Sequence, residues 1–200
     1  MPRSEDPTAR ARILDAAGRL FYERGIHDVG MAEVVAAAGT GKNVLYRHFP
    51  GKDELVLAYL EESAKLLDAA MDAAVADLPP DEALVAVARQ VAHQASRRGY
   101  RGCPFRNYVR ETRDTKGRPG RFALAQVRAL RRRIDELSTR AGVEDPERLA
   151  DRIWLTLEGA YAAAPYPERV PMAEAAVAHV EELVSQSPHS STVPSQERHR

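Results

Sequence analysis

The sequence has little cysteine and no excess of charge of either sign. Cys103 is the only cysteine among 200 residues, which excludes an intrachain disulfide and a metal cluster built on several cysteines. Lysine and arginine number 29 together, as do aspartate and glutamate, so the formal net charge is zero. A neutral chain does not attract nucleic acid over its whole surface, and any such contact must come from a local patch.

Long apolar runs are also missing. No segment is apolar for long enough to cross a bilayer, and the first 14 residues lack the apolar core of a signal peptide. We therefore expect a cytoplasmic protein without a membrane partner. Hydrophobic residues make up 44% of the chain, which is sufficient for a buried core at this length. The sequence shows no metal-binding motif, and we expect neither a metal nor a cofactor.

Apolar residues recur at helical spacing through most of the chain, and no stretch alternates as a strand would. Proline, glycine and acidic capping residues divide this pattern into about nine helices, so the predicted fold class is all-α. We expect an N-terminal helix-turn-helix domain over 1–51, a helical effector-binding and dimerisation domain over 52–186, and a disordered tail over 187–200.

Local signals place the individual helices. Helices should start at Asp6-Pro7, Asp53, Asp81-Glu82 and Asp145-Pro146, because an acidic cap stands at each of these points, followed in two of them by proline. Two short helices are expected over 31–37 and 42–49. Helices should end at Gly25 and at Gly142, and Leu78-Pro79-Pro80 should separate two helices. A short helix should begin at Cys103-Pro104, a loop should cover 114–120, and the last helix should begin at Pro171.

The most informative stretch is MAEVVAAAGTGKNVLYRHFPGK, residues 31–52. Two short helices flank Gly39, which can adopt the left-handed backbone of a tight turn. Val34, Val35 and Ala38 should pack on Leu20 and Phe21 of the first helix, with Leu45 and Phe49 anchoring the second short helix. The remaining polar face suits a helix in the major groove, and the predicted DNA contacts are Thr40, Lys42, Asn43, Tyr46, Arg47, His48 and Lys52.

The chemistry of these side chains fits DNA. Asn43 can pair with adenine through two hydrogen bonds, and Lys42 can reach guanine acceptors or a phosphate. Tyr46 and His48 can donate to phosphates. Lys52 lies near the start of the next helix, where its ammonium and free backbone N–H groups can together hold a phosphate. The alternative is the polar outer face of an ordinary helical bundle.

Several segments resemble the TetR family of bacterial transcriptional regulators. The matching blocks are Arg12–Ala17, Leu20-Phe21, Gly25, Ala37–Gly39, Leu45–Phe49 and Lys52–Leu55. In the turn, Gly41, Asn43 and Val44 stand where the family often has Ser, Gly and Thr, and Val29-Gly30 replaces a usual Thr or Ser cap. The resemblance implies a homodimer with three-helix DNA-binding heads, and an effector domain in which a small molecule releases a repressor from a palindromic DNA operator.

The resemblance also places the dimer interface on the last two helices. The apolar stripe there consists of Ile153, Leu157, Ala160, Tyr161, Ala176, Val180 and Val184, and the alternative is that this stripe faces the chain's own core. Effector sites are apolar and aromatic with a few polar groups. The candidates are Met71, His93, Tyr100, Cys103, Phe105, Tyr108, Phe122, Trp154 and Tyr161, with core packing as the alternative for each.

The sequence gives weaker support to other functions. We predict no catalytic residues, because no nucleophile, base and orienting group occur at recognisable spacing. A helical interaction module that does not bind DNA and a thiol-dependent sensor or enzyme using Cys103 stay open as alternatives. The run Arg131-Arg132-Arg133 could form a second DNA site. The adjacent Asp135-Glu136 favours the interpretation of this run as a solvated helix face.

Overall fold

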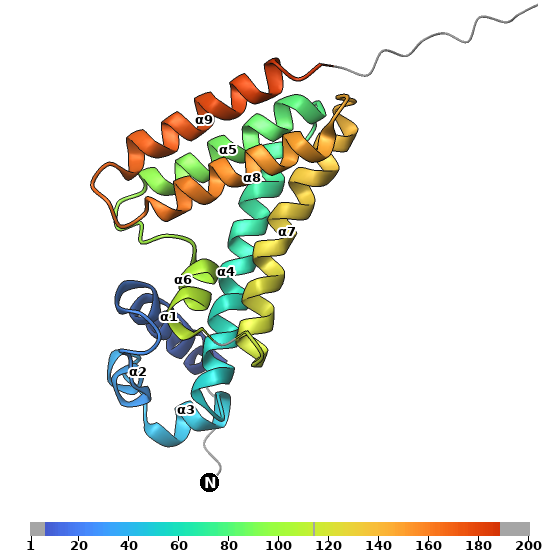
Figure 1. Cartoon of the computed structure of the whole chain (residues 1–200). Helices are drawn as coiled ribbons and strands as arrows, with labels where there is room; N and C mark the ends of the chain where they lie inside the picture. The colour runs from blue at the N-terminus through green and yellow to red at the C-terminus, as the bar shows by residue number, and fades with distance from the viewer. Residues whose placement is uncertain (1–6, 114, 189–200) are drawn as a thin grey trace, which may run out of the picture. The chain divides into compact units, whose positions relative to one another are not determined.

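The computed structural model describes residues 7–113 and 115–188. Over these residues the chain forms nine helices and no β-strand (Figure 1), which confirms the all-α fold class. None of these helices is both long and apolar enough to cross a membrane. The helices are α1 (Pro7–Arg24), α2 (Met31–Ala37), α3 (Lys42–His48), α4 (Lys52–Val75), α5 (Pro80–Ser96), α6 (Pro104–Thr112), α7 (Arg118–Arg140), α8 (Pro146–Ala162) and α9 (Arg169–Ser185).

Most of the predicted boundaries agree with these bounds to within a few residues. α8 begins as expected, because the Asp145 side chain accepts a hydrogen bond from the Arg148 backbone N–H at 3.0 Å and Pro146 opens the helix. The loop predicted over 114–120 is wrong in its second half. α7 already begins at Arg118, and Pro119 lies buried in its first turn, where a residue without an N–H loses no helical hydrogen bond.

Contacts divide the chain into two compact units. The first unit is Met1–Ala73 with Arg97–Leu130, and the second is Ala74–Ser96 with Arg131–Arg200. The three helices of the predicted head therefore share a unit with most of α4, with α6 and with the first half of α7. The functional division at residue 51 stays a prediction, and residues 189–200 of the predicted tail lie outside the described residues.

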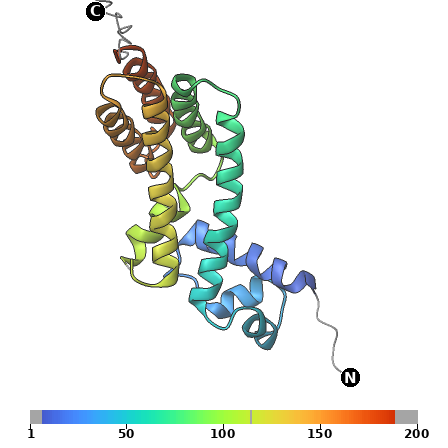
Figure 2. The same cartoon turned by 90° about the vertical axis from the view of Figure 1, so that its right-hand side faces the viewer.

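The head is built on one apolar cluster in the first unit. α1 contacts both α2 and α3, and its buried residues include Ile13 and Phe21. The Phe21 ring meets Tyr59 of α4 edge-on, with ring centroids 5.8 Å apart, where α1 crosses α4 (Figure 2). Of the predicted packing residues, Phe21, Val34, Ala38, Leu45 and Phe49 are buried, whereas Leu20 and Val35 are only half-buried.

Gly39 occupies the turn between α2 and α3 in the left-handed conformation, with φ of +57°, as predicted. A Cβ added there would meet no atom within 4 Å. Substitution is therefore opposed by the backbone conformation alone and not by crowding.

We expect Gly39→Ala to lower the free energy of unfolding by about 1–2 kcal/mol, the cost of a left-handed L-residue. Gly39→Asn is the matched control and should lose less, because asparagine tolerates this region better than alanine. Urea denaturation followed by circular dichroism measures both. Equal stability of the wild type and the alanine variant would contradict the role of the turn.

In the second unit, α5, α8 and α9 lie side by side (Figure 1). Arg89 of α5 pairs with Glu181 of α9 at 2.6 Å. Arg131 of α7 pairs with Asp151 of α8 at 2.7 Å and with Asp135 at 2.8 Å. Burial acts to lower the pKa of Arg131, but the hydrogen bonds to Asp151 and Asp135 outweigh it and raise that pKa. Arg131 is thus occupied by carboxylates, which supports the solvated, ion-paired interpretation of the arginine run.

The apolar stripe of α8 and α9 faces the interior of this unit. Burial within a single chain supports the core alternative for most of the stripe, because a side chain already enclosed has no surface to offer a second copy. Ile153, Leu157, Ala160, Ala176 and Val180 are buried, whereas Tyr161 and Val184 are half-buried, and the assignment of this stripe to the dimer interface stays a prediction.

Candidate nucleic-acid interface

The two faces of α3 differ sharply. Leu45 is fully buried, and Phe49, which caps the helix, is 2% exposed. The other face presents four of the predicted side chains to solvent at helical spacing: Lys42, Asn43, Tyr46 and Arg47. Thr40, His48 and Lys52 are half-buried. The fold thus places four of the seven predicted residues on one exposed face of α3, and their contact with DNA stays a prediction.

Tyr46 and Lys42 are in contact on this face. The Lys42 ammonium lies 5.9 Å from the centroid of the Tyr46 ring, one helical turn away. Attraction between the cation and the ring face restrains both side chains. The Tyr46 residue remains 39% exposed, so it is still available to a partner.

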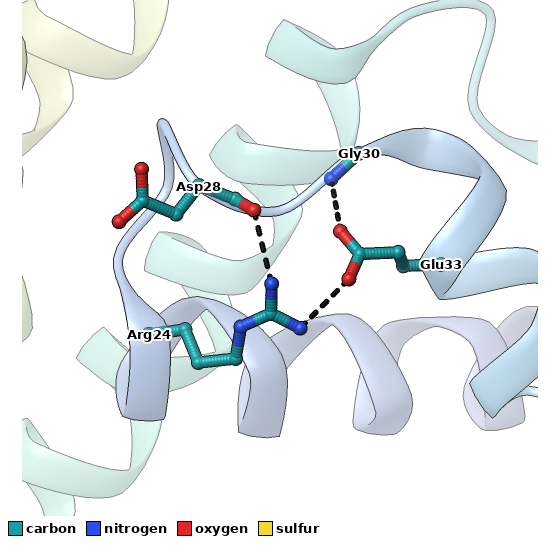
Figure 3. Close-up of polar contacts among 4 residues, drawn as sticks. All are labelled: Arg24, Asp28, Gly30 and Glu33. Carbon is teal, nitrogen blue, oxygen red and sulfur yellow. Dashed lines mark hydrogen bonds and ion pairs between the residues drawn. The ribbon is translucent and has the colours of Figure 1, made fainter.

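A polar network fixes the start of α2, and sequence reasoning missed it (Figure 3). Arg24, the last residue of α1, pairs with Glu33 at 2.7 Å and donates to the Asp28 carbonyl at 3.2 Å. The other Glu33 carboxylate oxygen accepts the Gly30 N–H at 2.9 Å. This hydrogen bond, followed by that from Arg24, lowers the pKa of Glu33.

Glu33 therefore supplies the cap that Gly30 cannot provide from a side chain. The signal was present in the sequence, because a glutamate three residues after the cap position is half of a capping box. Its partner Arg24 comes from another helix and has no such local signal. Together they orient α2, on which α3 rests.

Three further hydrogen bonds connect the end of α1 and the turn after it to α6 and to the residues just before α6. The Tyr22 hydroxyl donates to the Gly102 carbonyl at 3.0 Å and accepts the Arg101 N–H at 2.9 Å. The Glu111 carboxylate accepts the backbone N–H of His27, in the turn after α1. Burial raises the pKa of Tyr22, and the bond from Arg101 opposes this. The turn between α1 and α2 is thus attached to α6 within the first unit.

The effector-site candidates are divided between the two units. The first unit contains Met71, Tyr100, Cys103, Phe105, Tyr108 and Phe122, and the second contains His93, Trp154 and Tyr161. Phe105 and Tyr108 are buried, and Phe105 meets Phe122 edge-on with centroids 6.4 Å apart, which supports the core alternative for this group. His93 is exposed, so interpreting it as a core histidine is wrong.

Cys103 is the N-cap of α6 and is 9% exposed, and its sulfur lies 3.7 Å from an Arg106 guanidinium nitrogen. Its burial is that of a structural cysteine and gives no support to a thiol-dependent activity. Among the described residues, no group of three or more histidine, cysteine or acidic side chains is placed to hold a metal ion.

A hollow of about 500 Å³ in the second unit was not predicted. Its lining combines apolar side chains with acidic side chains of α5 and α9. None of the effector-site candidates lines it. Its lining residues are Leu78, Asp81, Glu82, Val85, Arg89, Ala141, Val143, Leu149, Glu181, Val184 and Ser185.

Known proteins share both the head and the whole fold. The family model described as "Bacterial regulatory proteins, tetR family" matches residues 13–59. The HTH-type transcriptional activator FasR of Mycolicibacterium smegmatis is 46% identical over 61 residues, which cover 30% of this chain and 26% of FasR. The HTH-type transcriptional regulator BetI of Brucella canis is 27% identical over 190 residues, covering 92% of this chain and 94% of BetI.

The similarity extends to solved structures. The crystal structure of SCO4454, a TetR-family transcriptional regulator from Streptomyces coelicolor, has a TM-score of 0.84 and 34% sequence identity. This match covers 90% of this chain and 95% of SCO4454. The similarity therefore includes the helical part beyond the head.

Proposed function

This chain belongs to the TetR family of bacterial transcriptional regulators, and from this premise we propose that it is a repressor that a small molecule releases from a palindromic operator. It is a DNA-binding regulator, and the proposal adds the direction of control, the release by an effector and a cytoplasmic location. The observation that carries it is the exposed face of Lys42, Asn43, Tyr46 and Arg47 on a helix anchored by Leu45 and Phe49.

The side chains of this face have separate roles in the proposal. Asn43 reads a base edge, because its amide can both donate to and accept from adenine. Lys42, Tyr46, His48 and Lys52 hold phosphates and fix the register of the helix in the groove. Arg47 on the exposed face of α3 and Thr40 in the turn before it complete the set of proposed contacts.

Selection of bound DNA from a random pool, with the full chain, tests the proposal. We expect a near-palindrome with half-sites about 34–36 Å apart, or a multiple of that spacing. A subsequent screen of small molecules for release of the selected DNA identifies the effector. A dimer that enriches no DNA site would instead support the helical interaction module.

The effector must act on the heads through contacts inside the chain. The attachment of α6 to the end of α1, through Tyr22 with Gly102 and Glu111 with His27, supports such a coupling within the first unit. A shift of α6 would move the turn that leads into α2. The effector itself would bind among the apolar and aromatic side chains of residues 52–186.

Regulators of this family bind DNA and dimerise, and we assign the homodimer interface to the exposed side of α8 and α9. Leu155 is 74% exposed and Met172 is 44% exposed. Gly159 and Ala162 follow Leu155 at helical spacing and are exposed as well. A Cβ on Gly159 would meet no atom within 4 Å of its own chain. Since a mid-helix glycine costs about 0.5–1 kcal/mol relative to alanine, a close partner helix explains its presence.

Leu155→Glu should therefore raise the dissociation constant of the dimer by about 100-fold or more, because an unpaired carboxylate in an apolar interface costs about 3 kcal/mol or more. Sedimentation equilibrium measures it. Leu66→Glu is the matched control, since Leu66 is 68% exposed on α4. If both variants remain dimeric like the wild type, the interface lies elsewhere.

A further inference from the structure

Arg10 of α1 lies against the end of the DNA-reading helix. Its guanidinium carbon is 5.1 Å from the centroid of the Phe49 ring, and Phe49 is the residue that caps α3. The arginine is exposed, whereas the ring beneath it belongs to a residue that is only 2% exposed. α1 thus places a positive charge at the C-terminal end of α3.

The form of this contact leaves the hydrogen-bond donors of Arg10 available. A guanidinium attracted to an aromatic ring uses its charge, and its five N–H donors still fan outward in a rigid fork. Two other arginines of the same helix form ion pairs with carboxylates. Arg19 gives a nitrogen to Asp15 at 2.6 Å, and Arg24 gives one to Glu33 at 2.7 Å. Within residues 7–113 and 115–188, no carboxylate pairs with Arg10.

We propose that Arg10 binds a phosphate of the operator beside the C-terminal end of α3, so that each head contacts DNA from α1 as well as from its helix-turn-helix. The inference rests on the proposed function, since it requires α3 to lie on DNA. Phosphate oxygens match the fork of N–H donors of an arginine. The ring already restrains the side chain, so binding has less conformational freedom to remove.

The surroundings of Phe49 agree with a backbone contact. His48 precedes it and Lys52 follows it three residues later, and both are predicted phosphate contacts. Arg10 adds a third basic group from α1, which is distant in the sequence but adjacent in space. In a chain whose formal net charge is zero, such a local cluster supplies the attraction that the whole surface lacks.

The test compares full-length wild type, Arg10→Gln and Arg10→Lys in fluorescence anisotropy titrations. Each protein is titrated with the selected operator and with an unrelated duplex at several salt concentrations. For Arg10→Gln we expect a fall in affinity of about 100-fold for both duplexes and a salt slope that is smaller by about 1.8, the value of two phosphate contacts, one from each head of the dimer. Arg10→Lys should restore the slope, because it restores the charge.

Arg19→Gln is the matched control, because Arg19 is an exposed arginine of the same helix whose donor is held by Asp15. Its salt slope should equal that of the wild type. The slope does not depend on the fraction of active protein, so the comparison holds even where a variant loses stability.

Three outcomes are distinguishable. An Arg10→Gln slope equal to that of the wild type overturns the phosphate contact and leaves Arg10 as a packing residue on Phe49. A wild type that binds neither duplex overturns the proposed function itself. A reduced slope in Arg10→Gln together with an unchanged slope in Arg19→Gln supports the inference.

Discussion

Leu45→Ala is expected to lower the free energy of unfolding of the first unit by about 2–5 kcal/mol. Leu45 has no exposed surface and is the buried anchor of α3. Truncation removes apolar contacts and leaves a cavity that the surroundings fill only in part. Because α3 is only seven residues long, it depends on this packing and not on its own helical propensity. Urea denaturation monitored by circular dichroism measures the loss.

DNA binding should fall with stability in this variant, since α3 loses its place on α1 and α2. Leu66→Ala provides the comparison in the same unit. Leu66 is 68% exposed, and its truncation should change stability by no more than about 0.5 kcal/mol. A Leu45→Ala protein that unfolds like Leu66→Ala would show that α3 is not anchored through this side chain.

The head could be predicted well because its signals are local. The turn at Gly39 and the alternation of buried Leu45 with exposed Tyr46 are encoded within a few residues. The cap supplied by Glu33 has an equally local signal, three residues from Gly30. The prediction of a loop over 114–120 was wrong in its second half because its local signal is ambiguous. Proline, as at Pro119, is typical both of loops and of the first turn of a helix.

Long-range contacts could not be predicted. Tyr22 meets Gly102 across 80 positions in the chain, and periodicity says nothing of which residue lies opposite a tyrosine. Helical spacing marked the stripe of Ile153 and Val180 as apolar without saying what covers it. The chain's own core covers these two residues, while Leu155 on the other side of α8 is exposed. Periodicity finds an apolar face, but only the packing of the neighbouring helices decides which partner it meets.

The double variant Lys42→Gln with Lys52→Gln should lower operator affinity by about 100-fold or more at physiological salt. Each lysine is assigned to a phosphate, and a charge-assisted hydrogen bond contributes about 1.5–3 kcal/mol. The salt slope should fall by about 3.6, since the proposed dimer brings four of these lysines to the operator and each phosphate contact contributes about 0.9. Both substitutions keep much of the side-chain length, Lys42 is exposed and Lys52 is half-buried, so stability should change by no more than about 0.5 kcal/mol for each.

Two comparisons make the result specific. Lys65→Gln removes an exposed lysine that pairs with Glu62 at 3.3 Å on α4, away from the reading face, and should leave the slope unchanged. Asn43→Ala should keep the slope of the wild type but alter the selected sequence, because Asn43 carries no charge and is assigned to a base. Anisotropy titrations over a range of salt concentrations separate these cases. If the double variant keeps the salt slope of the wild type, Lys42 and Lys52 do not contact phosphates. If Asn43→Ala has a smaller salt slope than the wild type, Asn43 does not act as a base contact alone, and the roles proposed for the residues of α3 are wrong.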